Sequence, residues 1–433
     1  MEFQPADPRL QPGGKERRLM RKDIAGTGME STIPTFEVLE SLVREQAQAF
    51  IQRVLEEEVT ELLGREKSER IEAVDAPRGY RNGYGKPRKL TMSSGTITVQ
   101  RPRVRDLEER FESRVLPLFA RRTKEVGELI PELYLHGLAE GDFDRALRGL
   151  LGEDAPLSKP TIRRQKAVWA EEFKVWNRRS LAGRKVVYVW VDGIYVKAGL
   201  DRERAALLVV IGAMTDGTKE VLALTSGYRE STESWAAVFR DLMARGLNEP
   251  RLLVADGNPG IWAAAAQVWP GAEEQRCWNH KTRNVLDRLP KREQKEAKEL
   301  LRAVAYAPSL AEVLEAREAF SKRYRPWYPK AVETLEDDWD RMVTFYGFPE
   351  SHWKHLRTTN IVESPFASVR LRTSAAKRFK RVENATALIW KLMGVAEKQF
   401  RKLDAPHQLK DVFEGRKFED GKPVSDQQRK EAA

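Results

Sequence analysis

Two aspartates occupy similar places in this sequence, each after an apolar run and directly before a glycine. Asp192 follows VVYVWV, and Asp256 follows RLLVA. Each alone fits a turn, because Asp-Gly is a common turn pair. Together they fit the ends of two neighbouring strands at one sheet edge, where their mutual repulsion would be relieved by a cation. Oxygen ligands suit Mg²⁺, and two such ions can clamp the attacking and leaving oxygens of a phosphoryl displacement.

A third carboxylate is needed for this chemistry, and Glu363 in RTTNIVES is the candidate. It lies near the start of a predicted helix in a strongly basic stretch, which fits a metal ligand beside bound phosphates. A first-turn glutamate favoured by the helix dipole is the alternative, and it would need no metal. The cations that follow it are Arg370, Arg372, Lys377, Arg378, Lys380 and Arg381.

The elements that must position these acids begin after Leu181. Three strand-like segments, a helix, the buried run RLLVAD and a further helix follow in that order. This order is that of a ribonuclease-H-like mixed sheet, although other α/β folds share parts of it. Residues 278–355 read as helical and charged, without a further strand. We therefore predict an α/β fold whose ribonuclease-H-like core is interrupted by an all-helical insertion.

Helical patterns precede this core. Apolar spacing predicts a long amphipathic helix from Thr35 to the stop at Gly64, and a basic hairpin around Ser-Ser-Gly follows. Residues 124–178 give three helical patterns with tight turns, as in a helix-turn-helix module. Arg163, Arg164 and Lys166 would then open the recognition helix. Packing against a neighbouring domain is the alternative for the helices, and a solvated surface is the alternative for the hairpin.

The predicted organisation has six parts. They are a flexible leader (1–33), an N-terminal helix and basic hairpin region (34–122), a helix-turn-helix-like DNA-binding domain (123–180), a catalytic domain in two segments (181–277 and 356–403), a helical insertion (278–355) and a flexible tail (404–433).

The composition favours a polyanionic partner. Among 433 residues, 76 Lys and Arg against 65 Asp and Glu give a net charge of +11, although a basic enzyme without a nucleic-acid partner has the same balance. The single cysteine, Cys277, excludes an internal disulfide and fits the cytoplasm. We expect no membrane span, because no segment approaches the roughly 20 apolar residues that one needs.

Four sequence blocks carry a resemblance to a known family. They are RNGY at Arg81–Tyr84, VDGIYVK at Val191–Lys197, QRCWNHKTRNVLDRLPK at Gln275–Lys291, and RTTNIVES at Arg357–Ser364. In this order they resemble the Mutator-type transposases of bacterial insertion sequences, which have a DDE active site, over about Met29–Leu403. Gly257 and Pro365 depart from the residues usual at those positions in the family.

The resemblance implies a DDE triad of Asp192, Asp256 and Glu363, which would hold two Mg²⁺ ions, with Mn²⁺ expected to substitute. The family's Cys-x-x-His pair corresponds to Cys277 and His280. We expect no zinc, because the pair supplies two of four ligands and no second pair follows. His280 would help to position a DNA strand, or else serve as a structural histidine.

The predicted function is metal-dependent DNA cleavage and strand transfer at the terminal inverted repeats of an insertion sequence. The partners would be double-stranded DNA, at the element ends and the target, and a second copy of the chain, with the long N-terminal helix as a dimer surface. Two alternatives remain: a non-catalytic DNA-binding protein, and a nuclease that cuts without joining. The residues predicted to contact DNA are Arg163, Arg164, Lys197, His280, Arg357, Arg370, Arg372, Lys377 and Arg378.

Overall fold

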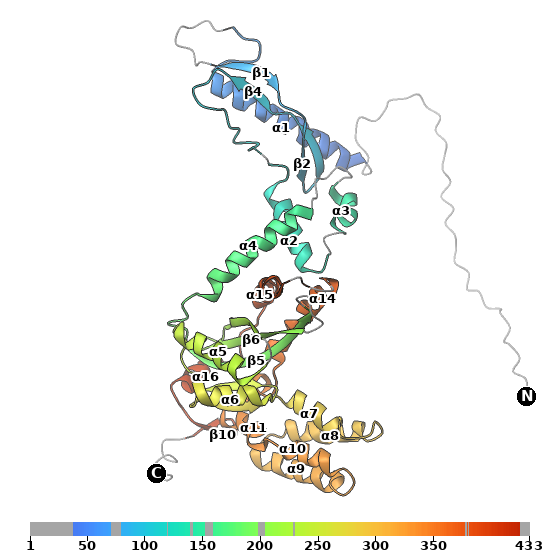
Figure 1. Cartoon of the computed structure of the whole chain (residues 1–433), viewed down its shortest axis with the longest axis vertical. Coiled ribbons are helices and arrows are strands. Elements are labelled where there is room, and N and C mark those ends of the chain that lie inside the picture. The colour runs from blue at the N-terminus through green and yellow to red at the C-terminus, as the bar shows by residue number, and fades with distance from the viewer. Residues whose placement is uncertain are drawn as a thin grey trace, which may run out of the picture. The chain divides into compact units, whose positions relative to one another are not determined.

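The computed structural model describes residues 38–70, 79–118, 120–138, 142–151, 159–197, 204–227, 230–376, 379 and 381–424 (Figure 1). They form two compact units, each considered by itself. The first holds the described parts of 1–85 and 99–115, and the second holds those of 86–98 and 116–433. The predicted leader lies outside the described residues. Among the described helices, none is long and apolar enough to span a bilayer.

The first unit is built on the long helix α1 (Leu39–Leu63), which confirms the helix predicted there. It ends at Gly64, whose φ of 63° is a left-handed conformation that glycine adopts without strain. The buried apolar residues lie in its C-terminal half, and its N-terminal half exposes an apolar stripe. The buried residues are Leu55, Val59 and Leu63, and the exposed ones are Leu39, Val43 and Phe50.

The RNGY block lies in a strand of the first unit. β1 (Tyr80–Tyr84) pairs antiparallel with β4 (Pro102–Arg105). The Arg81 guanidinium lies 2.9 Å from a Glu56 carboxylate oxygen and donates to the Thr60 hydroxyl at 2.6 Å. Both acceptors belong to α1, so Arg81 ties the strand to the helix.

The second unit begins with a hairpin and three helices, as predicted. The hairpin consists of β2 (Arg88–Met92) and β3 (Gly95–Val99). The Tyr134 and Trp169 rings pack with their centroids 6.2 Å apart. This contact joins the second and fourth helices of the chain. The helices are α2 (Lys124–Leu135), α3 (Phe143–Leu151) and α4 (Lys159–Asn177).

A five-stranded mixed sheet forms the centre of this unit, in the order β7-β6-β5-β8-β9. The first three strands pair antiparallel, and β8 and β9 extend the sheet in parallel with β5. The strands are β5 (Val186–Lys197), β6 (Arg204–Met214), β7 (Lys219–Gly227), β8 (Leu252–Ala255) and β9 (Glu273–Arg276).

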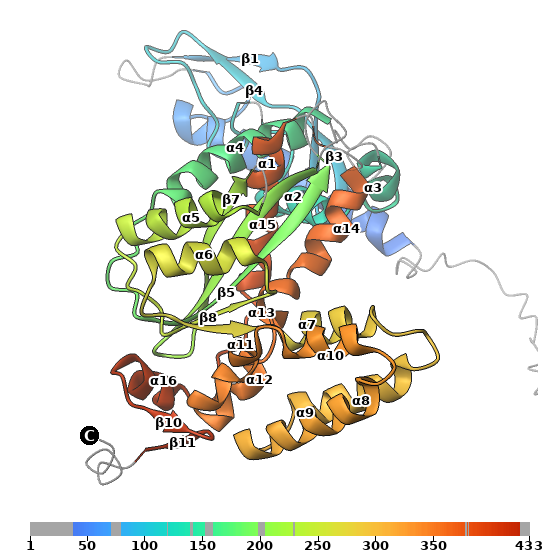
Figure 2. The same ribbon diagram turned by 60° about the horizontal axis from the view of Figure 1, so that its bottom comes forward.

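Both faces of the sheet are covered, which explains why its strands read as nearly continuous apolar runs. Alternate residues of β5 enter different cores: Tyr188 and Trp190 pack on one face, and Val189 and Val191 on the other. Figure 2 shows α5 (Thr232–Ala244) and α6 (Pro259–Val268) over the valine face. Helix α15 (Val382–Glu397) packs on the tryptophan face.

Short helices follow β9, as predicted for this segment. The first five are α7 (Trp278–Leu286), α8 (Gln294–Ala305), α9 (Leu310–Tyr324), α10 (Pro329–Glu336) and α11 (Trp339–Val343). The 3₁₀ turns Thr344–Gly347 and Glu350–His352 lead into α12 (Trp353–Leu356), α13 (Asn360–Glu363) and α14 (Phe366–Ala376).

The segment after Asp404 is folded up to residue 424, so the flexible tail predicted from residue 404 is wrong over that range. It forms α16 (Pro406–Phe413) and a small hairpin of β10 (Phe418–Glu419) and β11 (Lys422–Pro423). Leu409 and Val412 are buried. These two residues lie three apart on one side of α16, so they hold the helix against the core.

A buried histidine links the sheet to the segment before α13. His352 Nδ1 lies 2.9 Å from the Tyr188 hydroxyl, and burial lowers the pKa of His352 to about 4. The folded chain therefore keeps His352 neutral between about pH 4 and 6.5, whereas the unfolded chain protonates it below about 6.5. The contribution of neutral His352 to the free energy of unfolding is therefore fully present above pH 6.5, and it falls as the pH drops towards 4.

We expect the free energy of unfolding of the wild type to fall more steeply between pH 7 and 4.5 than that of His352→Gln. The difference should be about 1–3 kcal/mol, from the lowered pKa. Urea denaturation at the two pH values measures it. His407→Gln, at an exposed position, controls for the loss of a histidine. Equal pH dependence in the wild type and His352→Gln would contradict the expectation.

Candidate active site

Asp192 lies inside β5 rather than at its end, which corrects the predicted strand boundary. It pairs with Val209 of β6, so the antiparallel ladder continues past it. On the other side, pairing with β8 stops at Trp190 and Val254. Asp192 thus stands where β5 has lost its parallel neighbour. The Gly193 N–H donates to Asp192 Oδ1 at 2.8 Å and holds the carboxylate.

Asp256 follows β8 directly and occupies the matching place beside β5. Since Trp190 and Val254 are partners, Asp192 and Asp256 each lie two residues beyond a paired position. Side chains alternate with a period of two, so Asp192 follows Trp190 onto the face that α15 covers. The Asn258 N–H donates to Asp256 Oδ1 at 2.9 Å. The parallel pairing therefore brings the two acids to one sheet edge, as predicted.

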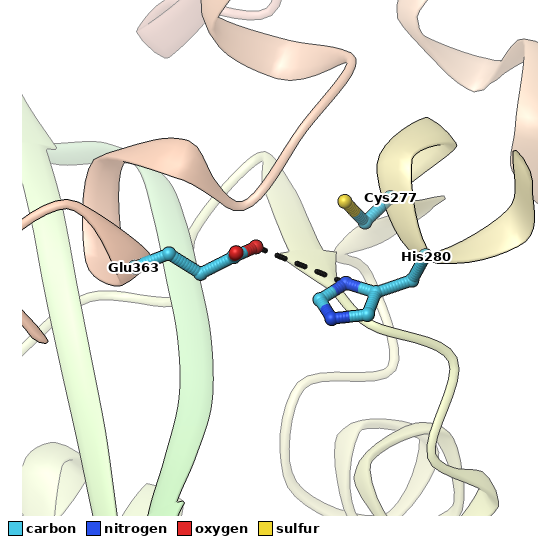
Figure 3. A group of neighbouring side chains, drawn as sticks. All are labelled: Cys277, His280 and Glu363. Carbon is cyan, nitrogen blue, oxygen red and sulfur yellow. Dashed lines mark ion pairs between the residues drawn. The ribbon is translucent and has the colours of Figure 1, made fainter. Parts of the chain in front are cut away.

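Glu363 reaches this region from α13, which packs against β5 and β6. The Thr359 hydroxyl donates to Glu363 Oε1, and His280 Nδ1 lies 3.8 Å from the same oxygen (Figure 3). Among the described residues, Glu363 forms a close group with Cys277 and His280. One ligand atom from each lies within 4.8 Å of the others. Asp192 and Asp256 stand outside that tight group.

The charges of the site are coupled. Burial first, then the neighbouring Asp256 carboxylate and, to a smaller extent, that of Glu363 raise the pKa of Asp192 to about 7. The adjacent Cys277 sulfur raises the pKa of His280 to about 9 against the effect of burial, and Glu363 and Asp256 act in the same direction. Without a cation, the acids therefore oppose one another's ionisation. Half-buried carboxylates that repel one another fit a divalent metal that prefers oxygen ligands.

A fourth carboxylate, Glu230, lies beside Asp256 and Gly193 and has no signal in the sequence. Asn258 Nδ2 donates to its Oε2 at 3.2 Å, and the Tyr195 hydroxyl donates to it as well. A Cβ atom on Gly193 would collide with the Glu230 carboxylate, so glycine leaves the space in which it lies. Burial, and then the Asp256 charge, raises the pKa of Glu230. It lies in a loop before α5, where neither periodicity nor spacing points to it.

Asn258 ties this acid to α6. Its side chain caps the helix by accepting from Gly260 N at 2.9 Å, and its amide donates to Glu230. We expect Asn258→Ala to lower the free energy of unfolding by about 1 kcal/mol, the usual effect of losing such a cap. Asn258→Ser keeps a cap acceptor and should recover most of this loss. Chemical denaturation measures both, and equal stability of the two variants would contradict the capping role.

Four of the residues predicted to contact DNA are exposed. Arg163 and Arg164 lie in the first half of α4, Lys197 ends β5, and Arg370 lies on α14. Their positions leave the guanidinium and ammonium groups accessible to solvent, and their contact with DNA stays a prediction.

Two other predicted DNA contacts pack against aromatic rings. The Arg372 guanidinium carbon lies 3.7 Å from the Tyr134 ring centroid, and Arg372 is buried. Arg357 lies 4.8 Å from the Tyr306 centroid and 4.9 Å from that of Phe345, and burial lowers the pKa of Arg357. Cation–π packing therefore engages both groups inside the fold. Lys377 and Arg378 lie outside the described residues.

Residues 25–402 match the sequence profile of a family described as "Transposase, Mutator family". Over 297 residues the chain is 43% identical to the transposase for insertion sequence element IS6120 of Mycolicibacterium smegmatis, covering 69% of this chain and 92% of that one. Over 285 residues it is 40% identical to the transposase for element IST2 of Acidithiobacillus ferrooxidans, covering 65% and 96%.

Among solved structures, the Drosophila P element transposase strand transfer complex is 14% identical, with a TM-score of 0.28. The similarity covers 66% of this chain and 84% of that chain.

Proposed function

This chain belongs to the Mutator family of transposases, and on that premise we propose that it cuts DNA at the terminal inverted repeats of an insertion sequence and joins the freed ends to target DNA. The reaction has two steps. Water attacks a phosphodiester at the element end and releases a 3′-hydroxyl. That hydroxyl then attacks a phosphodiester of the target, so that one P–O bond forms as another breaks.

The observation that carries this proposal is the placement of Asp192 and Asp256 in matching register, where β8 stops pairing with β5. We propose that the order β7-β6-β5-β8-β9 is a ribonuclease-H-like core, with α7–α12 inserted before the third acid. The match of antiparallel and parallel pairs to the predicted strand order supports this.

We propose that Asp192, Asp256 and Glu363 hold two Mg²⁺ ions, with Mn²⁺ as a substitute. When bound, such ions supply a stronger nucleophile at neutral pH and stabilise the leaving oxygen. The chain itself orients the ligands: backbone N–H groups hold both aspartates, and Thr359 holds Glu363. These contacts lock the carboxylate oxygens in place before substrate arrives, which is the preorganisation that such a site needs.

We further propose that α2–α4 recognise the terminal repeats as a helix-turn-helix-like unit. Arg163 and Arg164 lie near the start of α4 and are exposed, as a helix that enters the major groove requires. The exposed Arg370 lies on the helix that follows Glu363 and is suited to a phosphate close to the reacting bond.

Strand transfer joins two ends, so we propose that a second copy of this chain binds through the exposed stripe of α1, formed by Leu39, Val43 and Phe50. Phe50→Glu should weaken dimerisation at least tenfold, because both copies lose an apolar anchor; tenfold in affinity is about 1.4 kcal/mol. Ala49→Glu adds the same charge at the adjacent exposed position, outside the stripe. Sedimentation equilibrium measures both, and equal dimerisation of the two variants would contradict the proposed surface.

Incubation of the protein with a precut element end, a supercoiled target and Mg²⁺ tests the function. We expect a joined product that appears only with the divalent cation. Metal-dependent cutting without joining would indicate a nuclease, and specific end binding without any metal-dependent reaction would indicate a repressor. Either result would overturn the proposed strand transfer.

A further inference from the structure

A sulfur, a nitrogen and an oxygen ligand converge beside the proposed magnesium site. They belong to Cys277, which precedes α7, to His280 in its first turn, and to Glu363 at the end of α13 (Figure 3). One ligand atom from each lies within 4.8 Å of the other two. We propose that these three side chains bind a thiophilic divalent cation of the zinc class, at a centre separate from the magnesium pair that shares one carboxylate with it.

The sequence offers only the Cys277–His280 pair as zinc ligands, and the fold adds Glu363 as a third. The C-x-x-H spacing places Cys277 and His280 on one side of the first turn of α7, because residues three apart on a helix are neighbours. Glu363 lies 363 − 280 = 83 residues later, so no local spacing could join it to the pair. Three protein ligands with an open fourth position form a common zinc arrangement.

The surroundings of the sulfur suit a thiolate. Cys277 is fully buried, and the Thr359 N–H donates to its Sγ at 3.3 Å. The Thr359 hydroxyl lies 3.2 Å from the same sulfur and also bonds Glu363. One residue thus orients two of the three ligands from behind, which is the role of an outer shell at metal centres.

The imidazole has an unsatisfied atom on the same side. His280 Nδ1 is shielded from solvent, has no hydrogen-bond partner among the residues that the structure describes, and lies 3.8 Å from Glu363 Oε1. A buried nitrogen of this kind normally has a partner. A cation between the sulfur, Nδ1 and Glu363 Oε1 would satisfy it and would neutralise the carboxylate.

The donor set selects the class of cation. Thiolate and imidazole favour zinc and cobalt, whereas magnesium prefers oxygen ligands alone. The site is therefore distinguishable from the proposed magnesium pair by its chemistry, although both use Glu363. The binding does not depend on the proposed function, because it is measured on the protein without DNA or turnover.

Cobalt(II) titration of the full-length, reduced protein tests the proposal, with absorption spectroscopy as the readout. The wild type should develop a near-ultraviolet thiolate-to-cobalt charge-transfer band that zinc abolishes on displacing the cobalt. Because the chain has one cysteine, such a band arises from Cys277, and Cys277→Ser should lack it.

His280→Ala and Glu363→Gln should each retain the thiol but weaken cobalt binding at least tenfold. Loss of an outer-shell residue already weakens metal binding by about 10- to 100-fold, and loss of a ligand should weaken it at least as much. Glu230→Gln is the matched control, because it removes a nearby carboxylate outside the three-ligand group, and its cobalt affinity should equal that of the wild type. Circular dichroism confirms that each variant is folded.

Absence of the band in the wild type would overturn the site. Unchanged affinity in both His280→Ala and Glu363→Gln would also overturn it, because the signal would then come from an isolated thiolate. Failure of strand transfer leaves the cobalt spectrum unaffected, so the two proposals fail separately.

Discussion

Asp256→Asn is expected to reduce DNA cleavage by at least about 1000-fold, because removal of a ligand from a metal pair forfeits several kcal/mol of transition-state stabilisation, and each 1.36 kcal/mol is tenfold. Binding of the element ends should stay within a few-fold of the wild type, because the substitution preserves side-chain shape and lies outside the proposed recognition helices. Gel-based cleavage and electrophoretic mobility shift measure the two effects on the same substrate.

Asp216→Asn is the matched control, since Asp216 also precedes a glycine. Its carboxylate accepts from Thr218 N at 3.0 Å in the turn between β6 and β7. Asp216 is therefore an Asp-Gly turn residue, which is the alternative role for Asp256. Its substitution should leave cleavage near the wild-type rate. Equal activity of Asp256→Asn and Asp216→Asn would show that Asp256 is also a turn residue and would contradict the catalytic assignment.

Trp190→Ala is expected to produce the largest loss of stability, about 3–5 kcal/mol, the range for removing a fully buried aromatic side chain. Trp190 is fully buried between Ile211 of β6 and Val254 of β8. Its Nε1 donates to the His355 carbonyl oxygen at 3.0 Å. The side chain therefore fastens the strand that carries Asp192 to the segment that leads to α13. A loss of this size is a large part of the 5–15 kcal/mol typical of folded domains.

Equilibrium denaturation with urea measures this loss. Trp190→Phe keeps most of the apolar volume and loses the hydrogen bond, so it should lower the free energy of unfolding by about 1–2 kcal/mol. Trp327→Ala, at a position that is 75% exposed, controls for the loss of a tryptophan and should have little effect. A loss in Trp190→Ala no larger than that in Trp327→Ala would contradict the structural role.

The strands that the sequence revealed are those buried on both faces. β5, β6 and β8 have nearly continuous apolar runs, and their burial explains why. β9 has the sequence EEQR, and its first two residues are not buried. Its pairing with β8 therefore has no apolar signature. The sequence predicts that β5 ends at Asp192 because the Asp-Gly pair is typical of a turn, whereas β6 continues to pair with β5 beyond Asp192.

The parts of the site that sequence could indicate are those near a motif. Asp192 and Glu363 lie within characteristic blocks, and Asp256 follows an apolar run directly before a glycine. Parallel pairing explains why the two aspartates meet. The position of Glu230 beside Asn258, and the proximity of Cys277 to Glu363, depend on which loops the fold brings together. Such long-range contacts leave no periodicity in the chain, so their prediction requires the packed structure.

Isothermal titration of Mg²⁺ or Mn²⁺ measures whether these acids hold divalent metal. Wild type and Asp256→Ala would each be titrated in the presence of a cleaved-end DNA duplex. We expect the wild type to bind metal and Asp256→Ala to lose this binding. Identical titration curves for the two proteins would contradict the metal site and would make the acids structural.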